Sequence, residues 1–113
     1  MTLQQLEYIL AVNQFRHFAK AAEYCRVTQP TLSAMIQKLE EELEVPLLIR
    51  HSKSVSLTDA GEQFAHHARR ILGGVDQLSE LMHKQSLLEA GTLKIGLLWI
   101  AGYTNLLQIL SDY

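Results

Sequence analysis

The chain has 113 residues, of which 48% are hydrophobic, and its 10 basic and 12 acidic residues give a formal net charge of −2, an ordinary globular composition. The length allows one domain, or a small domain with an appendage. The longest apolar stretch, Leu97 to Ala101, is far too short to span a bilayer, and the amino terminus lacks the basic region of a signal peptide. Because Cys25 is the single cysteine, no intramolecular disulfide can form, and the cytoplasm is the expected location.

Two short helices are predicted first, over residues 2–13 and 18–25. Thr2 and Gln5 have the spacing of a capping box, in which each side chain satisfies a backbone N–H at the helix start. The spacing of apolar residues then defines one buried face for each helix. These faces consist of Leu3, Leu6, Ile9 and Leu10 in the first helix and of Phe18, Ala21, Ala22 and Cys25 in the second.

A third helix is predicted over residues 28–43. Thr28 is a favourable N-cap, and Pro30 suits the first turn, where its missing N–H costs nothing. The buried stripe of this helix consists of Leu32, Ile36, Leu39 and Leu43. The opposite face is polar with almost no charge and consists of Pro30, Ser33, Ala34 and Gln37.

A small β-hairpin is predicted over residues 47–57. The apolar run 47–49 and the alternation of Val55, Ser56 and Leu57 flank a polar link at 51–54, and no helical stripe passes through them. Residues 1–58 are therefore expected to form a small module of three helices and one hairpin.

A long helix is predicted after the hairpin, with Thr58 as its N-cap and Asp59 in its first turn. Its uninterrupted heptad seam consists of Phe64, Ala68, Ile71, Val75, Leu78 and Met82. A helix over residues 59–88 is roughly 45 Å long at ~1.5 Å per residue, which is too long for the preceding module to cover. The seam therefore predicts a homodimer through this coiled-coil helix. Gly73 and Gly74 each cost roughly 1 kcal/mol in mid-helix, so a kink or an irregular turn is expected there.

The hydrophobic period changes once more after Gly91. The alternation over residues 93–97 is typical of a β-strand, and residues 103–113 have a helical pattern. One strand and one helix are not stable alone, because their polar edges and apolar faces have no partners. The expected organisation is therefore a module over 1–58, a linker helix over 59–90 and the truncated start of an α/β domain over 91–113.

The module has the element order of a winged helix-turn-helix, in which the start of the third helix reads base edges in the major groove, ~12 Å wide. Gln29 can read adenine bidentately, whereas Thr28 and Pro30 are explained equally well by helix initiation. Lys53 lies in the wing tip, which suits a minor groove, although a solvated hairpin edge has the same composition. The candidate DNA-contacting residues are Thr28, Gln29, Pro30, Thr31, Ser33, Gln37, Lys38, Arg50 and Lys53.

Charge in this module is segregated. The sequence pI of about 6.2 removes overall basicity as an argument for nucleic-acid binding, and six basic residues balance six acidic ones through residue 58. Four of those acids lie within residues 40–44, at the far end of the third helix. Repulsion by DNA phosphates would turn that end outward and favour docking by the other end.

Enzymatic and metal-binding functions have little support. His66 and His67 are adjacent, so on a helix they diverge by ~100° and cannot ligate one metal together. No HExxH, CxxC or Gly-rich phosphate loop occurs. Cys25 has the spacing of a core residue. We expect no enzyme, no cofactor and no metal.

The sequence resembles the DNA-binding region of the LysR-type transcriptional regulators. The match covers about residues 3–90, and the motifs AAE, TQPTLS, LEEEL, LLIR and LTDAG occur in the family's order and spacing. The resemblance implies a bacterial DNA-binding regulator that dimerises through its linker helix, often forms tetramers, and binds a dyad-symmetric promoter site. It also implies a small-molecule effector domain beginning near Thr92.

The resemblance assigns groove contacts to Gln29, Pro30, Thr31 and Ser33, and contacts of the wing to Arg50 and Lys53. The sequence departs from the family pattern at two positions. Ala34 stands where a basic residue is frequent, and Lys38, one turn on, is a candidate substitute. Glu44 stands where glycine is common, so the third helix has to end without the residue that best adopts a left-handed conformation.

Two other classes of function compete with a DNA-binding regulator. In the first, the winged fold is a protein adaptor and the heptad helix pairs with a partner, so binding barely responds to salt. In the second, Cys25 and the histidines form a redox or metal switch, so Cys25→Ser or a chelator changes the activity. The sequence does not specify the operator, the regulated genes, the effector, or activation versus repression.

Overall fold

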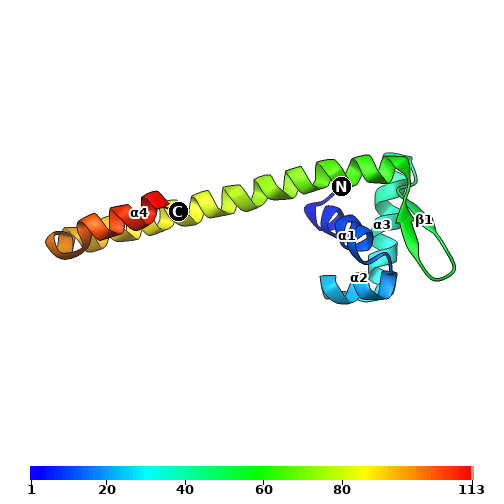
Figure 1. Cartoon of the computed structure of the whole chain (residues 1–113), viewed down its shortest axis with the longest axis horizontal. Coiled ribbons are helices and arrows are strands. Elements are labelled where there is room, and N and C mark those ends of the chain that lie inside the picture. Colours follow the sequence, from blue (N-terminus) through cyan, green and yellow to red (C-terminus); the bar gives the residue numbers. More distant parts are fainter. Residues whose placement is uncertain (113) are drawn as a thin grey trace. The chain divides into compact units, whose positions relative to one another are not determined.

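A computed structural model describes the backbone of residues 1–112 and the side chains of residues 1–90. The elements follow in the order α1 (Leu3–Phe15), α2 (Phe18–Cys25), α3 (Gln29–Leu43), β1 (Leu48–Arg50), β2 (Val55–Leu57) and α4 (Asp59–Asp112) (Figure 1). This order confirms the predicted fold class, a mainly helical winged helix-turn-helix followed by a long helix. The chain divides into two compact units, 1–73 and 74–113. The domain boundaries expected at residues 58 and 90 stay predictions.

The predicted helix starts are confirmed by their hydrogen bonds. Thr2 Oγ1 accepts the N–H of Gln5 at 3.2 Å, and Gln5 Oε1 accepts the N–H of Thr2 at 2.9 Å, which completes the capping box of α1. Thr28 Oγ1 accepts the N–H of Thr31 at 3.3 Å, with Pro30 in the first turn of α3. These contacts span three residues of sequence, which is why sequence reasoning could find them.

The first helix differs from its prediction at both its end and its face. It extends to Phe15, beyond the expected end at residue 13, and Leu3 is exposed, whereas Tyr8 and Val12 are buried. The reason is that α1 packs against α2, α3 and β2 together, so its buried surface is wider than one amphipathic stripe. Leu3, in the first turn, lies outside that surface.

Three helices end at a residue with positive φ that is not glycine: Arg16, Arg26 and Glu44, with φ of 56°, 60° and 58°. This conformation costs a residue with a Cβ about 1–2 kcal/mol. At Arg16 the side chain offsets part of that cost, because its Nε donates to the carbonyl of Asn13 at 3.0 Å. The expectation that α3 ends without a glycine is confirmed, since Glu44 itself adopts the left-handed conformation.

The core lies where the three short helices meet the hairpin and the first turns of α4. The predicted stripe of α3 is confirmed for Leu32, Ile36 and Leu39, which are fully buried, whereas its last member, Leu43, is half-buried. Gln5 is the buried polar residue of the core among the described side chains, and its Nε2 donates to the carbonyl of Met35 at 3.0 Å. The larger fully buried side chains are Ile9, Val12, Leu32, Ile36, Leu39, Leu47 and Val55.

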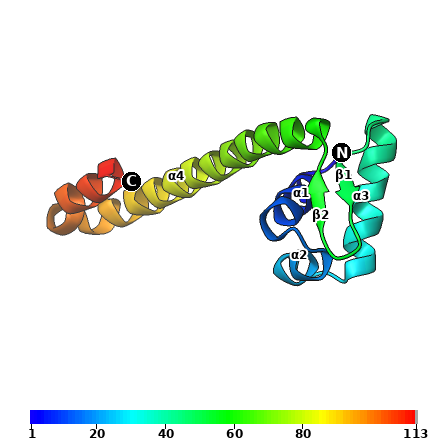
Figure 2. The same ribbon diagram turned by 45° about the vertical axis from the view of Figure 1, so that its right-hand side comes forward.

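The predicted hairpin is confirmed as an antiparallel pair, in which Leu48 faces Leu57 and Arg50 faces Val55 (Figure 2). A carboxylate from α3 holds its first strand. Glu40 Oε2 accepts the N–H of Leu47 at 2.7 Å and that of Leu48 at 3.3 Å. The position of the wing relative to α3 therefore depends on a side chain seven residues away in sequence.

The start of α4 is tied to the segment that enters the hairpin. Thr58 Oγ1 accepts the N–H of Gly61 at 3.0 Å and donates to the carbonyl of Pro46 at 2.8 Å, which confirms Thr58 as the N-cap. The N–H of Thr58 donates to the carbonyl of Leu47 at 3.0 Å. That carbonyl lies directly against Gly61, where a Cβ would overlap it.

The last helix is longer than predicted. α4 has 54 residues, and its bounds include residues 93–97, so the strand expected there is wrong. A helix satisfies its backbone hydrogen bonds internally, whereas a strand needs a neighbouring strand, and β1 and β2 already pair with each other. The start of an effector domain expected over 91–113 lies outside the residues whose side chains are described.

The glycine pair in α4 does not form the irregular turn that the sequence predicted. Gly73 and Gly74 are helical, neither has positive φ, and a Cβ on either would meet nothing within 4 Å. A kink there stays a prediction. The seam residues begin in the core, where Ala68 is buried and Phe64 half-buried, and Val75 further along is also half-buried. The exposed seam residues are Ile71, Leu78 and Met82.

Candidate nucleic-acid interface

The start of α3 presents a row of exposed side chains, most of them polar. Thr28, Gln29, Pro30 and Thr31 are all exposed, and Ser33 is half-buried. The hydroxyl of Thr28 is occupied by the cap, because it accepts from the N–H of Thr31 and donates to Thr31 Oγ1 at 2.8 Å. This favours helix initiation over base contact as the role of Thr28, whereas no such local bond explains Gln29.

Arg50 is held at the base of the wing by two other elements. Its guanidinium lies 4.8 Å from the ring centroid of Phe18 on α2, and its Nη1 donates to Ser33 Oγ on α3 at 3.3 Å. The stacking geometry is that of a cation–π contact, which contributes about 0.5–1 kcal/mol at an exposed site. The structure therefore brings the predicted residues Ser33 and Arg50 together and fixes the direction of the guanidinium. Sequence reasoning did not find the part that Phe18 plays.

Residues from the start of α3, from the wing tip and from the start of α2 line one small pocket. Its volume is about 260 Å³, and it brings together Gln29 and Lys53, which the sequence had placed in separate elements. His17, the N-cap of α2, also lines this pocket, and sequence reasoning missed it. The available signal was its position just before Phe18, where a side-chain acceptor is favoured. The polar residues that line the pocket are His17, Gln29, His51, Ser52, Lys53 and Ser54.

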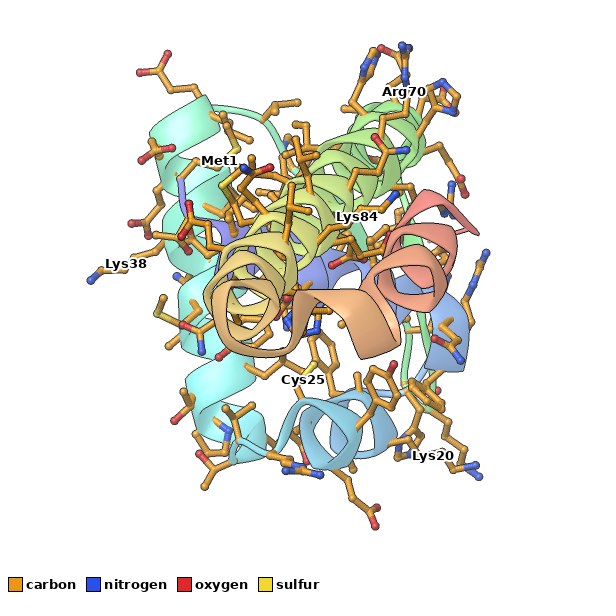
Figure 3. All side chains as sticks on the ribbon, turned by 90° about the vertical axis from the view of Figure 1, so that its left-hand side faces the viewer. Met1, Lys20, Cys25, Lys38, Arg70 and Lys84 are labelled. Atoms are coloured by element: carbon orange, nitrogen blue, oxygen red, sulfur yellow. The ribbon has the colours of Figure 1, made fainter. Side chains whose placement is uncertain are left out.

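The remaining predicted residues lie apart from this pocket. Gln37 and Lys38 are exposed on later turns of α3. Figure 3 shows Lys38 pointing outward on the opposite side of the module from Lys20 of α2. Any groove contact by Lys38 would therefore come from the far part of α3 and not from the cluster around Gln29 and Lys53.

The charges along α3 are arranged as the sequence predicted. No acidic side chain lines the pocket at the start of α3, whereas Glu41 and Glu42 are exposed toward its end. Glu42 pairs with the Met1 ammonium at 2.7 Å, an exposed contact that contributes little free energy. The electrostatic potential at the start of α3 is thus more favourable to an anion than at its end.

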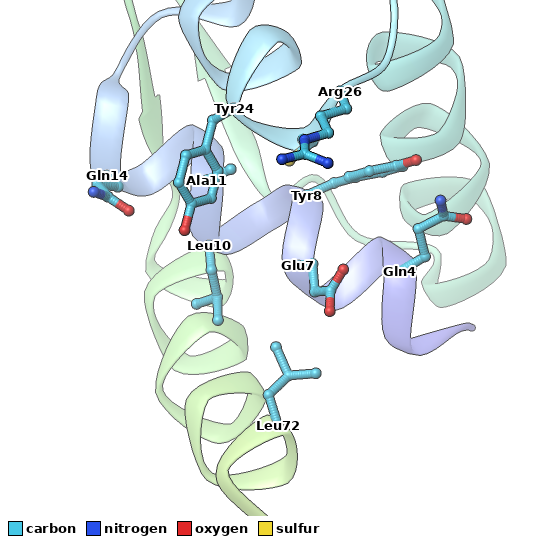
Figure 4. A pocket seen from close by; sticks show the side chains of 10 residues that line it. Gln4, Glu7, Tyr8, Leu10, Ala11, Gln14, Tyr24, Arg26 and Leu72 are labelled. Carbon is cyan, nitrogen blue, oxygen red and sulfur yellow. The ribbon is translucent and has the colours of Figure 1, made fainter. Parts of the chain in front are cut away.

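Cys25 lines a separate pocket of about 520 Å³ on the α1 and α2 side. Figure 4 shows Glu7, Tyr8 and Arg26 on one side of it and Gln14 and Tyr24 on the other. Burial raises the pKa of the Cys25 thiol, and the negative charge of Glu7 raises the pKa further. A raised pKa reduces the thiolate fraction, which is the reactive form. The geometry therefore does not favour Cys25 as a redox switch.

We expect Cys25 to react with iodoacetamide at pH 8 several-fold more slowly in the folded chain than after unfolding in urea, because its pKa is raised. The same shift favours the folded state below the ordinary thiol pKa, and this contribution is lost as the pH rises through the folded-state pKa. Glu7→Gln should speed the reaction of the folded chain. Equal rates in the folded and unfolded chains would contradict the shift.

Among the described residues, no group of histidine, cysteine and carboxylate side chains could hold a metal ion. In that same part of the chain, no helix has both the length and the hydropathy needed to cross a membrane. Every buried side-chain nitrogen or oxygen there has a hydrogen-bond partner.

The chain is similar in sequence to known bacterial regulatory proteins. The family model "Bacterial regulatory helix-turn-helix protein, lysR family" matches residues 3–62. The chain is 44% identical over 102 residues to the DNA-binding transcriptional dual regulator OxyR of Escherichia coli K12, covering 90% of this chain and 33% of that protein. It is 42% identical over 113 residues to the HTH-type transcriptional regulator AlsR of Bacillus subtilis, covering all of this chain and 37% of that protein.

Solved structures of such regulators are similar to this chain in fold as well as in sequence. The complex of the BenM DNA-binding domain with benA site 1 DNA has a TM-score of 0.70 and 41% identity, covering 74% of this chain and 96% of that one. Full-length OxyR C199D of Pseudomonas aeruginosa has a TM-score of 0.70 and 42% identity, covering 74% of this chain and 28% of that one. The chain spans about a third of the length of the curated relatives that it matches.

Proposed function

Because the chain belongs to the lysR family of bacterial regulatory helix-turn-helix proteins, we propose that it is a sequence-specific, dimeric regulator that binds promoter DNA. The observation that carries this proposal is the pocket between the exposed start of α3 and the wing tip, which Gln29 and Lys53 both line and which no acidic side chain lines. A DNA backbone needs cations and N–H donors, and base edges need a planar amide or hydroxyl. The family is one of regulators and not a class of enzymes.

We propose that α3 enters the major groove by its amino-terminal end. The side-chain amide of Gln29 has the geometry to bond adenine N6 and N7, and Pro30 and Thr31 lie beside it to contact base edges or phosphates. Gln37 and Lys38, on later turns, face the flanking backbone. The support for this direction is that the acidic residues gather at the opposite end of α3.

The wing supplies the second part of the proposed interface. Lys53 at its tip is exposed, and Arg50 at its base is fixed by Phe18 and Ser33. A cation held in place loses less conformational entropy when it binds DNA than a freely rotating one. We therefore propose that Arg50 and Lys53 contact the DNA backbone or the adjacent minor groove, where the electrostatic potential is most negative.

We further propose that the seam of α4 pairs with the seam of a second copy. Ile71, Leu78 and Met82 are large apolar side chains that are each about half exposed. A stripe of this kind is stabilised when another helix covers it. The full-length regulator is proposed to assemble further into a tetramer, to bind a small-molecule effector through the domain that follows residue 91, and to act in the cytoplasm, where the chromosome lies.

The experiment that tests this function is a binding titration by fluorescence anisotropy at two salt concentrations. The probes are a duplex from the promoter region beside the protein's own gene and a random duplex of equal length. A regulator that contacts six or more phosphates should lose about 1,000-fold or more in affinity between 50 and 200 mM salt, and it should prefer the promoter duplex. Absence of salt-dependent binding by the folded dimer would favour the protein-adaptor alternative.

We expect Gln29→Ala to reduce the preference for promoter DNA over random DNA by ~1–3 kcal/mol, because one bidentate base contact is lost. Binding to random duplex should change little, since that binding depends on phosphates. Parallel titrations of both duplexes at one salt concentration measure the difference. An equal loss on the two duplexes would refute base reading by Gln29.

A further inference from the structure

The pocket between α2, α3 and the wing tip has the composition of an anion site. Its polar lining consists of one lysine, two histidines, one glutamine and two serines, Phe18 and Ala19 complete the lining, and no carboxylate lines it. Its volume of about 260 Å³ is larger than a phosphate group requires. The groups come from three separate segments, around His17, Gln29 and Lys53, so only the folded module assembles them.

The hydrogen bond at the start of α2 determines which nitrogen of His17 carries the proton. Nδ1 accepts the backbone N–H of Lys20 at 3.3 Å, so its lone pair is in use. In the neutral ring the proton is therefore on Nε2, which makes Nε2–H a donor on an exposed side chain. The cap thus holds the imidazole in place and leaves one N–H free to donate to a ligand.

We propose that this pocket binds one phosphodiester group of the DNA backbone, which Lys53 neutralises and to which His17 donates its Nε2–H. This inference rests on the DNA-binding function proposed above and assigns His17 a role that sequence reasoning did not give it. A phosphate oxygen is an acceptor only, and a cation together with an N–H donor satisfies it. Ser52 and Ser54 add hydroxyl donors at the same rim.

A phosphate bound in this pocket also positions Gln29 relative to the bases. Gln29 lines the same pocket as His17 and Lys53. A phosphate bound there fixes the distance between the DNA backbone and the first turn of α3, and so sets the register in which the Gln29 amide meets a base. His51 also lines the pocket, and its ring is held against the second strand, because its Nε2 lies 3.1 Å from Ser56 Oγ.

The test uses His17→Asn, because asparagine is itself a favourable N-cap and keeps α2 capped while removing the imidazole N–H. Binding to random duplex is measured over a series of salt concentrations for this variant, for Lys53→Ala and for the control His66→Asn, which changes an exposed histidine of α4. His17→Asn should weaken binding about three- to tenfold with an unchanged salt slope, because the imidazole donor to the phosphate is lost while Lys53, which neutralises the phosphate, remains. Lys53→Ala should weaken binding and also reduce the slope of log affinity against log salt concentration by about 1. His66→Asn should change neither the affinity nor this slope.

Ethylation interference on the promoter duplex then identifies the phosphate. Ethylating the phosphate bound in the pocket should weaken binding of the wild-type chain, and this effect should disappear at the same phosphate in both His17→Asn and Lys53→Ala. The inference would be overturned if His17→Asn bound DNA with wild-type affinity, or if His17→Asn and Lys53→Ala lost interference at two different phosphates. In either case the proposed DNA binding would still stand. If the wild-type chain shows no salt-dependent binding at all, the proposed function fails first and this inference fails with it.

Discussion

Gly61→Ala is expected to lower the free energy of unfolding by about 3 kcal/mol or more, at the upper end of the range for overpacking a core. Gly61 is buried in the first turn of α4, and an added Cβ would overlap the carbonyl oxygen of Leu47 and lie 3.1 Å from Leu57 Cβ. The carbonyl cannot easily move, because it accepts the N–H of Thr58 at 3.0 Å. The reason for glycine here is this close approach and not its backbone conformation, since no glycine in the described chain has positive φ.

Urea unfolding followed by circular dichroism measures this effect, and Gly73→Ala is a matched control. Gly73 is an exposed helical position where a Cβ meets nothing within 4 Å, so alanine there should raise the free energy of unfolding by about 1 kcal/mol through helix propensity. Replacing glycine by alanine is thus expected to lower the free energy of unfolding at position 61 and to raise it at position 73 of the same helix. A stability of Gly61→Ala within 1 kcal/mol of the wild type would show that the turn before β1 can move aside.

Glu40→Ala is expected to lower the free energy of unfolding by about 2–3 kcal/mol, because two backbone N–H groups lose a charged acceptor. Leu47 and Leu48, whose N–H groups are affected, are buried at the entry to the wing. The variant should also bind both promoter and random duplex more weakly, since the wing loses its link to α3. Glu40→Gln, which keeps a neutral acceptor, should lie between the wild type and the alanine variant.

The control for Glu40 is its neighbour Glu41, which has the same charge but is exposed. Glu41→Ala should change the free energy of unfolding by less than about 0.5 kcal/mol, as expected for a surface substitution. Comparing the two variants separates the hydrogen bonds of Glu40 from the general effect of removing one negative charge from α3. Equal stabilities of the two variants would contradict the structural role of Glu40.

The two acidic neighbours illustrate how far sequence reasoning could go at the site. The sequence correctly places the run of acids at 40–44 at the end of α3 opposite Gln29, because helical periodicity determines that geometry. Sequence alone counted Glu40 as one of four acids at the far end of the third helix. Its bonds to Leu47 and Leu48 depend on where the chain returns after the turn, which no local pattern specifies.

The same limit explains why the predicted burial of Leu3 and the predicted strand over residues 93–97 are wrong. Leu3 fits the amphipathic stripe of α1, yet its burial depends on which elements surround that helix. Residues 93–97 alternate as in a strand, yet a strand forms only where another strand can pair with it, and here they belong to α4. Periodicity describes what a segment can bury, whereas its neighbours decide what it does bury.

The sequence by itself determined the helix starts at Thr2, Thr28 and Thr58, the buried stripe of α3, the hairpin and the family resemblance. These features depend on contacts within a few residues, so side-chain chemistry and spacing specify them. Only the tertiary structure decided that Arg50 stacks on Phe18 and that His17 meets Lys53 in one pocket. Those contacts join segments that are 30 or more residues apart, and the packing of the whole core is what brings them within reach.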